Sequence, residues 1–286
     1  MATIMKLIHL VICTTFWHFL ISGVTGHIVP IVVTNKCPFT IWPATAPNTG
    51  HPVIAKGGGF CLRSQQSTFI HTPWDWSGRI WARTGCSFSS SSASNHTNNN
   101  NNNNNNNPPT PACQTGDCDG HLECNGLTGK PPATLVELTL HTDKNQPSFF
   151  DVSLVDGYNL PVSVLSDITK SNCAIHGCLR DLKKTCPWEL QLKDGRGNVV
   201  ACKSACVAFN NDRFCCRNQY GSPDKCKPTL YSSVFKSACP SYVSYAFDDS
   251  SSTLVSCLVR RLYITFCPAS WGDDGDSILP QQYASN

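Results

Sequence analysis

Cysteine content constrains this chain more than any other feature. The 286 residues contain 18 cysteines, and 17 of them follow residue 26. The cytosol keeps thiols reduced, so a protein with this many crosslinkable sulfurs belongs in an oxidising compartment. Each disulfide removes entropy from the unfolded chain and stabilises the fold by roughly 2–4 kcal/mol. We therefore expect an exported protein that is held together by disulfide bonds.

The N-terminus agrees with export. Met1–Lys6 carries one positive charge, Leu7–Ile21 is largely apolar, and Ser22–Gly26 supplies small residues at the cleavage positions. This order of segments predicts a signal peptide over residues 1–26. No later stretch approaches the ~20 apolar residues of a membrane span, and the tail over residues 269–286 is polar and acidic. We expect a secreted protein without a transmembrane segment.

The charge balance argues against a nucleic-acid partner. The formal net charge is +3, and it falls to about +2 once Lys6 leaves with the signal peptide. No run of lysines or arginines is present, so the chain lacks the basic patch that phosphate backbones require.

Most segments with a readable pattern predict β-strands. Arg79, Trp81 and Arg83 alternate with apolar residues, and Glu137 and Asp151 fall on the polar faces of two further strands. Many short strands between turns rich in Gly and Pro indicate a mainly β fold, an antiparallel β-sandwich. The predicted strands are Ile28–Val33, Phe39–Trp42, Arg79–Arg83, Thr134–His141, Phe149–Val155 and Leu262–Phe266, the first two joined as a hairpin by Thr34–Lys36.

Residues 173–239 have a different character. Nine cysteines fall there, and the pattern predicts only short helices, Lys203–Phe209 and Tyr231–Ala238. We expect a subdomain of loops and short helices that is stabilised by disulfides instead of by a large core of its own.

A low-complexity insert occupies residues 89–111. It contains a serine run and ten consecutive asparagines from Asn98 to Asn107, a composition that cannot bury apolar surface. We therefore expect a disordered loop. Asn95 begins an Asn-His-Thr sequon, which predicts N-glycosylation on that loop.

Zinc is a poor explanation for the cysteines. Cys202 and Cys206, followed by Cys215 and Cys216, have spacings that a metal site tolerates, but no Cys/His quartet with finger-like spacing accompanies them. The chain also lacks a phosphate-binding glycine loop and a nucleophile elbow. We expect neither a metal nor a cofactor.

The run Cys113-Gln-Thr-Gly-Asp-Cys118-Asp-Gly-His-Leu-Glu-Cys124 resembles a motif of the thaumatin-like proteins, the plant pathogenesis-related group that includes osmotin and thaumatin. The resemblance implies one thaumatin-like domain over residues 27–268. That domain would consist of the sandwich, the disulfide-rich subdomain at about 173–239 and a small third subdomain. Six further stretches match in the family's order: Gly78–Cys86, Pro131–Leu135, Asp151–Pro161, Val200–Cys206, Tyr231–Pro240 and Ile264–Pro268.

The resemblance also implies a set of disulfides that spacing alone cannot select. Cys61 has no partner in this scheme, and we expect a buried, inert thiol there, with a mixed disulfide or an intermolecular bridge as the alternatives. The implied pairs are Cys37–Cys267, Cys86–Cys113, Cys118–Cys124, Cys173–Cys257, Cys178–Cys239, Cys186–Cys202, Cys206–Cys215 and Cys216–Cys226.

Members of this family carry an acidic cleft between the sandwich and the disulfide-rich subdomain. The positions that match it here are Arg79, Glu137, Asp151, Asp156 and Asp248. Asp156 has the other strand parity, but Asp156-Gly157 is a turn signal that would redirect the side chain at the strand end. Trp81 or Tyr158 could supply an aromatic platform for a sugar beside these charges.

The resemblance implies an antifungal defence protein of plants, a monomer that binds β-1,3-glucan or the fungal surface through this cleft. It would be secreted to the apoplast, with the vacuole as the alternative destination. The same carboxylates, with Glu137 and Asp151 as candidate catalytic residues, leave open a weak endo-β-1,3-glucanase, provided that their pKa values are pushed apart. A third alternative is an inhibitor of foreign hydrolases.

Overall fold

A computed structural model of the protein describes residues 28–88, 111–141, 143, 145–168, 173–248 and 253–268. The predicted signal peptide, nearly all of the asparagine-rich insert with Asn95, and the acidic tail lie outside the described residues.

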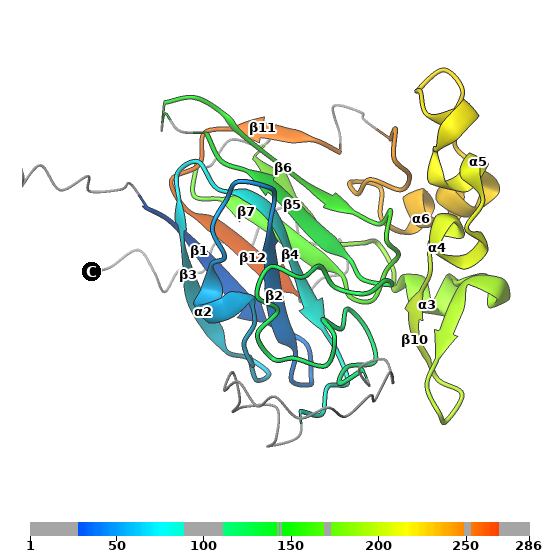
Figure 1. Cartoon of the computed structure of the whole chain (residues 1–286), viewed down its shortest axis with the longest axis horizontal. Helices are drawn as coiled ribbons and strands as arrows, with labels where there is room; N and C mark the ends of the chain where they lie inside the picture. Colours follow the sequence, from blue (N-terminus) through cyan, green and yellow to red (C-terminus); the bar gives the residue numbers. More distant parts are fainter. Residues whose placement is uncertain are drawn as a thin grey trace, which may run out of the picture.

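Two five-stranded sheets pack face to face as a sandwich (Figure 1). The first has the order β3 (Ser67–Pro73), β1 (Ile28–Asn35), β12 (Leu262–Phe266), β7 (Val162–Ser166) and β8 (Ala174–Ile175). The second has the order β11 (Val255–Cys257), β6 (Ser148–Ser153), β5 (Leu135–Thr139), β4 (Ser77–Arg83) and β2 (Trp42–Pro47). A mainly β sandwich is therefore confirmed, with one parallel pair, β1 and β12, among antiparallel ones.

Alternation along the strands builds the core. Phe150 and Val152 on β6 are buried together with Val136 and Leu138 on β5, whereas Phe149 is 42% exposed. Side chains of opposite parity on these strands consequently face away from the core, and this outer face of the second sheet carries the candidate site.

The predicted hairpin between Ile28–Val33 and Phe39–Trp42 is wrong. β1 pairs with β3 and β12 in one sheet, and β2 pairs with β4 in the other. After β1 the chain crosses between the layers, where the backbone N–H of Ile41 donates to the carbonyl of Leu62. Short-range turn signals could not reveal this crossing, because the true partners of β1 lie tens to hundreds of residues away.

The remaining elements gather mostly at one end of the sandwich (Figure 1). α2 (Ala55–Gly58) lies apart from them, beside β2. The predicted helix at 203–209 begins two residues later, because the Ser204 hydroxyl accepts a hydrogen bond from the backbone N–H of Val207 and caps the first turn. The others are α3 (Leu182–Thr185), η2 (Trp188–Leu190), β9 (Gln191–Lys193), β10 (Val199–Cys202), α4 (Ala205–Phe209), α5 (Asp212–Cys215), η3 (Asn218–Tyr220) and α6 (Leu230–Ala238).

Seven of the eight implied disulfides are formed among the described residues. Cys37–Cys267 ties the turn after β1 to the end of β12, and the other six join Cys86–Cys113, Cys118–Cys124, Cys178–Cys239, Cys186–Cys202, Cys206–Cys215 and Cys216–Cys226.

The structure differs from the expectation at the eighth pair. Cys173 and Cys257 are both buried and unbonded, although their side chains are neighbours joined by a hydrogen bond. Burial raises the pKa of the Cys257 thiol, and the adjacent Cys173 raises it further. Both effects disfavour the thiolate, which is the species that reacts to form a disulfide.

The expectation for Cys61 is also wrong in one respect. Its thiol is unpaired but exposed, not buried. The reason is local: Leu62 is buried in the core where it bridges to Ile41, so the preceding side chain points the other way.

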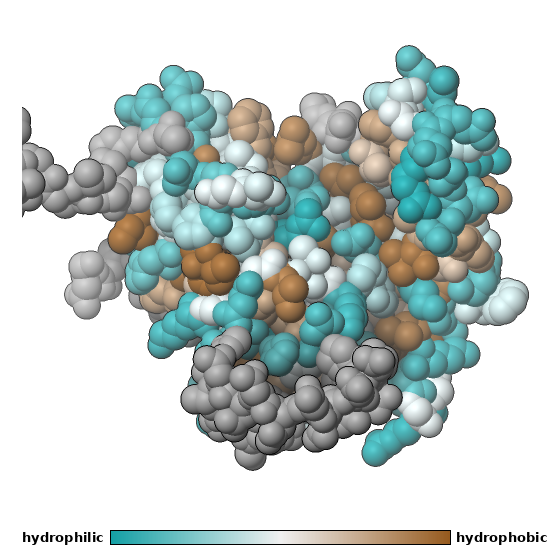
Figure 2. Space-filling view, in the orientation of Figure 1, coloured by the Kyte–Doolittle hydropathy of each residue, from teal (hydrophilic) through white to brown (hydrophobic). Residues whose placement is uncertain are grey.

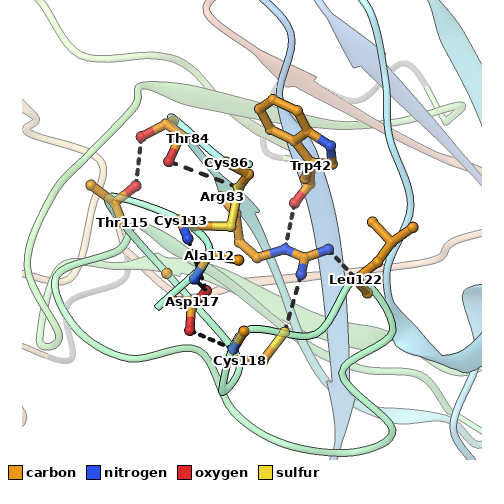
Figure 3. The surroundings of a disulfide bond; sticks show 12 residues. Trp42, Arg83, Thr84, Cys86, Ala112, Cys113, Thr115, Asp117, Cys118 and Leu122 are labelled. Carbon is orange, nitrogen blue, oxygen red and sulfur yellow. Dashed lines mark hydrogen bonds between the residues drawn. A yellow bond between two sulfur atoms is a disulfide. The ribbon is translucent and has the colours of Figure 1, made fainter. Parts of the chain in front are cut away.

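The loop that carries the Thr-Gly-Asp motif is organised by two buried charged residues (Figure 3). The Asp117 carboxylate accepts hydrogen bonds from the backbone N–H groups of Ala112, Cys113 and Gly120 at 2.8–3.0 Å. Arg83 approaches the same loop from β4. The motif's aspartate therefore shapes the loop.

Candidate acidic site

Three of the predicted site residues lie side by side across the second sheet. Arg79 on β4 is directly opposite Glu137 on β5, and Glu137 is directly opposite Asp151 on β6. Facing residues on antiparallel strands have Cβ atoms about 4.5–5.5 Å apart. Arg79 Nη2 lies 3.4 Å from Glu137 Oε1, so the arginine and the central carboxylate form an ion pair at the surface.

Asp156 joins this row from the turn after β6. The backbone N–H of Gly157 donates to the carbonyl of Leu154, and Gly157 has a φ of +100°, which a residue with a side chain rarely adopts. The turn brings Asp156 close enough for its charge to raise the pKa of Glu137, while the charge of Arg79 lowers the pKa of both. We call Arg79, Glu137, Asp151 and Asp156 the acidic row.

Asp248, the fifth predicted residue, already has its own cationic partner. Its Oδ2 lies 2.7 Å from Lys236 Nζ on α6 and accepts hydrogen bonds at 2.8 Å from the backbone N–H and the hydroxyl of Ser244. Val243 bridges to Ser153, so this segment runs beside the end of β6. The charge of Asp248 is thus compensated locally by Lys236, a residue that sequence reasoning missed because it lies off the apolar face of α6.

Burial raises the pKa of both Glu137 and Asp156. The positive charge of Arg79 opposes this rise in pKa for both residues. The negative charge of Asp156 adds to the rise for Glu137. A carboxyl group with a raised pKa keeps its proton to a higher pH, where it can donate as well as accept a hydrogen bond. The acidic row therefore combines a cationic donor, Arg79, with two carboxyl groups, Glu137 and Asp156, that keep their protons to a higher pH than usual.

Neither aromatic residue suggested by the sequence can serve as a sugar platform. Trp81 and Tyr158 are both fully buried. The Trp81 indole N–H donates to the carbonyl of Gly116, and the Tyr158 hydroxyl donates to Asp181. The alternation along β4 correctly put Trp81 on the same face as Arg79. The loop around Gly116 covers Trp81 on that face, and the alternation of side chains along a strand cannot predict that another loop will cover one of them.

A group of aromatic side chains lies beside Val155, the residue before Asp156. A small pocket of about 30 Å³ contains Val155, which precedes Asp156, together with Phe214, Tyr231 and Tyr245. The rings of Phe214 and Tyr231 pack edge to face with centroids 5.7 Å apart. Figure 2 shows the lobe that carries α4, α5 and α6 beside the sandwich, with hydrophilic and hydrophobic residues mixed along the surface between them. The sequence periodicity of residues 231–238 predicted the apolar face of this helix. It could not predict that Tyr231 on that face would lie in a pocket with Val155.

Two other observations apply to the part of the chain that the structure describes. It contains no group of three or more His, Cys, Asp or Glu side chains arranged to hold a metal ion. It also contains no helix with the length and apolar character needed to cross a lipid bilayer.

Comparison with known proteins places most of the described fold in one family. The model of the family described as "Thaumatin family" matches residues 35–268. An osmotin-like protein of Solanum lycopersicum is 44% identical over 240 residues, which cover 83% of this chain and 88% of the relative. Pathogenesis-related protein 5 of Arabidopsis thaliana is 42% identical over 253 residues, covering 88% and 96%.

Among solved structures, a laminaripentaose-producing β-1,3-glucanase in complex with laminaritetraose has a similar fold, with a TM-score of 0.55 and 13% identity over 85% of this chain and 99% of that chain. From the family match and these relatives, the chain belongs to the thaumatin family.

Proposed function

We propose that this protein is a secreted plant defence protein that binds β-1,3-glucan of the fungal cell wall through the acidic row. The observation that carries the proposal is the register that sets Arg79, Glu137 and Asp151 side by side on the outer face of the second sheet. The defence role is supported by relatives named osmotin-like and pathogenesis-related.

The chemistry of the row suits a neutral sugar polymer. Ionised carboxylates accept hydrogen bonds from hydroxyl groups, and the Arg79 guanidinium donates to hydroxyl and ring oxygens. The side chains of Arg79 and Glu137 are 30% and 38% exposed, so a ligand can reach both. A glucan chain would lie along the row, with one end near the aromatic rings of Phe214 and Tyr231, which share a pocket with Val155. A protein of similar fold that holds laminaritetraose supports this ligand class.

Retention on insoluble β-1,3-glucan tests the proposal. The purified protein should co-sediment with the polysaccharide, and Asp151→Asn and Glu137→Gln should each reduce retention several-fold. Asp224→Asn, which removes one exposed carboxylate from the disulfide-rich subdomain, is the matched control and should behave like the wild type. Absence of retention, or equal retention of all variants, would contradict a binding role for the row.

One observation favours a second candidate, weak endo-β-1,3-glucanase activity. Burial raises the pKa of Glu137 and Asp156, and a carboxyl with a raised pKa is what a glycosidase uses as its general acid. Release of reducing sugar from laminarin, lost in Glu137→Gln, would establish this activity. If Glu137→Gln released as much sugar as the wild type, the activity would have to come from elsewhere.

A further inference from the structure

A second, larger pocket lies away from the acidic row and shares no residue with it. Its volume is about 430 Å³, within the range of roughly 300–1,000 Å³ that is typical of small-molecule sites. One wall comes from the start of β2 and the segment before it, with Trp42 and Phe39. The other wall comes from the disulfide-rich subdomain, with Val199, Val200 and Lys183. Junctions between two packed units are frequent places for ligand sites.

The aromatic wall is held in place before any ligand arrives. Phe88 packs edge-on against Trp42 with ring centroids 6.2 Å apart. Arg83 fixes both residues. Its Nε donates to the Trp42 carbonyl at 3.0 Å (Figure 3), and its guanidinium lies 5.5 Å from the centre of the Phe88 ring. Phe39 is 44% exposed, so a large part of its apolar ring is accessible to a ligand in the pocket.

The opposite wall is apolar because of an irregularity in β10. Consecutive residues of a regular strand point to opposite faces, yet Val199 and Val200 both line the pocket. The register between β9 and β10 shifts between Val199 and Ala201, and such a bulge redirects a side chain. Leu160 lines the same pocket together with the two valines and the aromatic residues.

The charge at this pocket is of one sign. Among the described residues that line it, Lys183 is the only one with a charged side chain, and none is acidic. Lys183 Nζ lies 3.9 Å from Asp181 Oδ2, which is a long contact, and the side chain is 22% exposed. The other oxygen of Asp181 accepts hydrogen bonds from the Lys183 backbone N–H and the Tyr158 hydroxyl. The ammonium group therefore has room for a second anionic partner.

The polar residues that line the pocket, Asn159, Thr84, Thr40 and Gln114, restrict where a ligand can form hydrogen bonds. Asn159 is buried and uses both ends of its amide: it donates to Ala82 and Thr115 and accepts from Thr134 and Leu160. The Thr84 hydroxyl is paired with that of Thr115. Thr40 and Gln114 remain at the edge, where they can contact a polar group.

We propose that this pocket binds a small amphipathic anion, an aromatic monocarboxylate, with its ring between Phe39, Trp42 and the two valines and its carboxylate on Lys183. The site is independent of the acidic row, which would repel an anion. An aromatic ring between aromatic and branched side chains gains burial on both faces, and a carboxylate near a half-buried ammonium gains a charge-assisted hydrogen bond.

Calorimetric titration of the full-length protein with trans-cinnamate tests the proposal. Cinnamate should bind, and cinnamyl alcohol, which has the same ring without the charge, should bind about tenfold more weakly, as expected for a lost hydrogen bond to a charged group. Lys183→Gln should cause a similar loss for cinnamate and little loss for the alcohol. Phe39→Ala should weaken both ligands.

Lys184→Gln provides the control, since Lys184 is the exposed neighbour of Lys183 on α3 and does not line the pocket. It should leave cinnamate binding unchanged, and all variants should keep wild-type retention on β-1,3-glucan if the two sites are independent. The proposal is overturned if cinnamate does not bind, if the alcohol binds equally well, or if Lys183→Gln and Lys184→Gln have the same effect.

Discussion

The guanidinium of Arg83 donates from Nη1 to the carbonyl of His121 at 2.8 Å, so a fully buried cation on β4 holds the loop between Cys118 and Cys124. The same side chain donates to the carbonyls of Leu122 and Trp42. Burial lowers the pKa of Arg83 to about 10, with the charge of Asp117 opposing the shift, so the residue is still a cation at neutral pH.

We expect Arg83→Met to destabilise the protein by at least about 3 kcal/mol, because three carbonyl oxygens lose a charged donor inside the fold. Urea unfolding with the disulfides intact measures this. Arg63→Met, at an exposed position, should cost less than about 0.5 kcal/mol. Similar midpoints for the two variants would show that Arg83 is not a structural cation.

Stability should depend on pH through Glu137. Burial raises its pKa above the ordinary value of 4.5, so the folded protein holds the proton more tightly than the unfolded chain does. The stabilisation from that proton is complete below the ordinary pKa and is lost as the pH rises through the raised one. Glu137→Gln cannot ionise, so its stability relative to the wild type should increase as the pH rises from below 4.5 to beyond the raised pKa.

Unfolding at several pH values measures this difference. Glu123→Gln, an exposed glutamate in the loop near α2, should leave the pH profile unchanged. A constant difference between Glu137→Gln and the wild type would mean that the fold does not perturb Glu137.

The three free cysteines among residues 28–268 that the structure describes should react at different rates. Cys61 is exposed, whereas Cys173 and Cys257 are buried and the pKa of Cys257 is raised. A maleimide should modify one thiol rapidly in the native protein and two more only after unfolding without reductant. Cys61→Ser should abolish the rapid phase. If only one thiol reacted even in denaturant, Cys173 and Cys257 would be joined in solution.

Disulfides that close different lengths of chain should differ in their contribution. Cys37–Cys267 spans 230 residues and Cys118–Cys124 spans 6. The chain-entropy estimate is ~5 kcal/mol for the long loop and ~2 kcal/mol for the short one. Replacing each pair by serines and comparing the free energy of unfolding tests the ratio. A larger loss for the short loop would point to its contacts with Arg83 as the dominant effect.

Much of the acidic row could be predicted from local pattern and family resemblance. The alternation of Arg79, Glu137 and Asp151 put each on the polar side of its strand, and the turn signal at Asp156-Gly157 placed the fourth member at a strand end. Both kinds of signal act over a few residues, because side-chain direction in a strand has a period of two.

The predictions of a hairpin and of an aromatic platform were wrong because both depend on contacts between distant parts of the chain. Whether Ile28–Val33 pairs with its neighbour in sequence or with β12 depends on contacts more than 200 residues apart, and the cover over Trp81 comes from a separate loop. The pairing of Asp248 with Lys236 likewise depends on where α6 docks.

By itself the sequence determined the crosslinked β architecture, the family and the residues that could form an acidic site, because these follow from composition, short periodicities and motifs. Only the tertiary structure decided that Glu137 lies between Arg79 and Asp151, that Asp248 is neutralised by Lys236, that the Cys61 thiol is exposed, and that Lys183 faces an apolar pocket. Burial and charge pairing are properties of segments brought together from distant parts of the chain, and those long-range contacts set the pKa values and the open surfaces on which function depends.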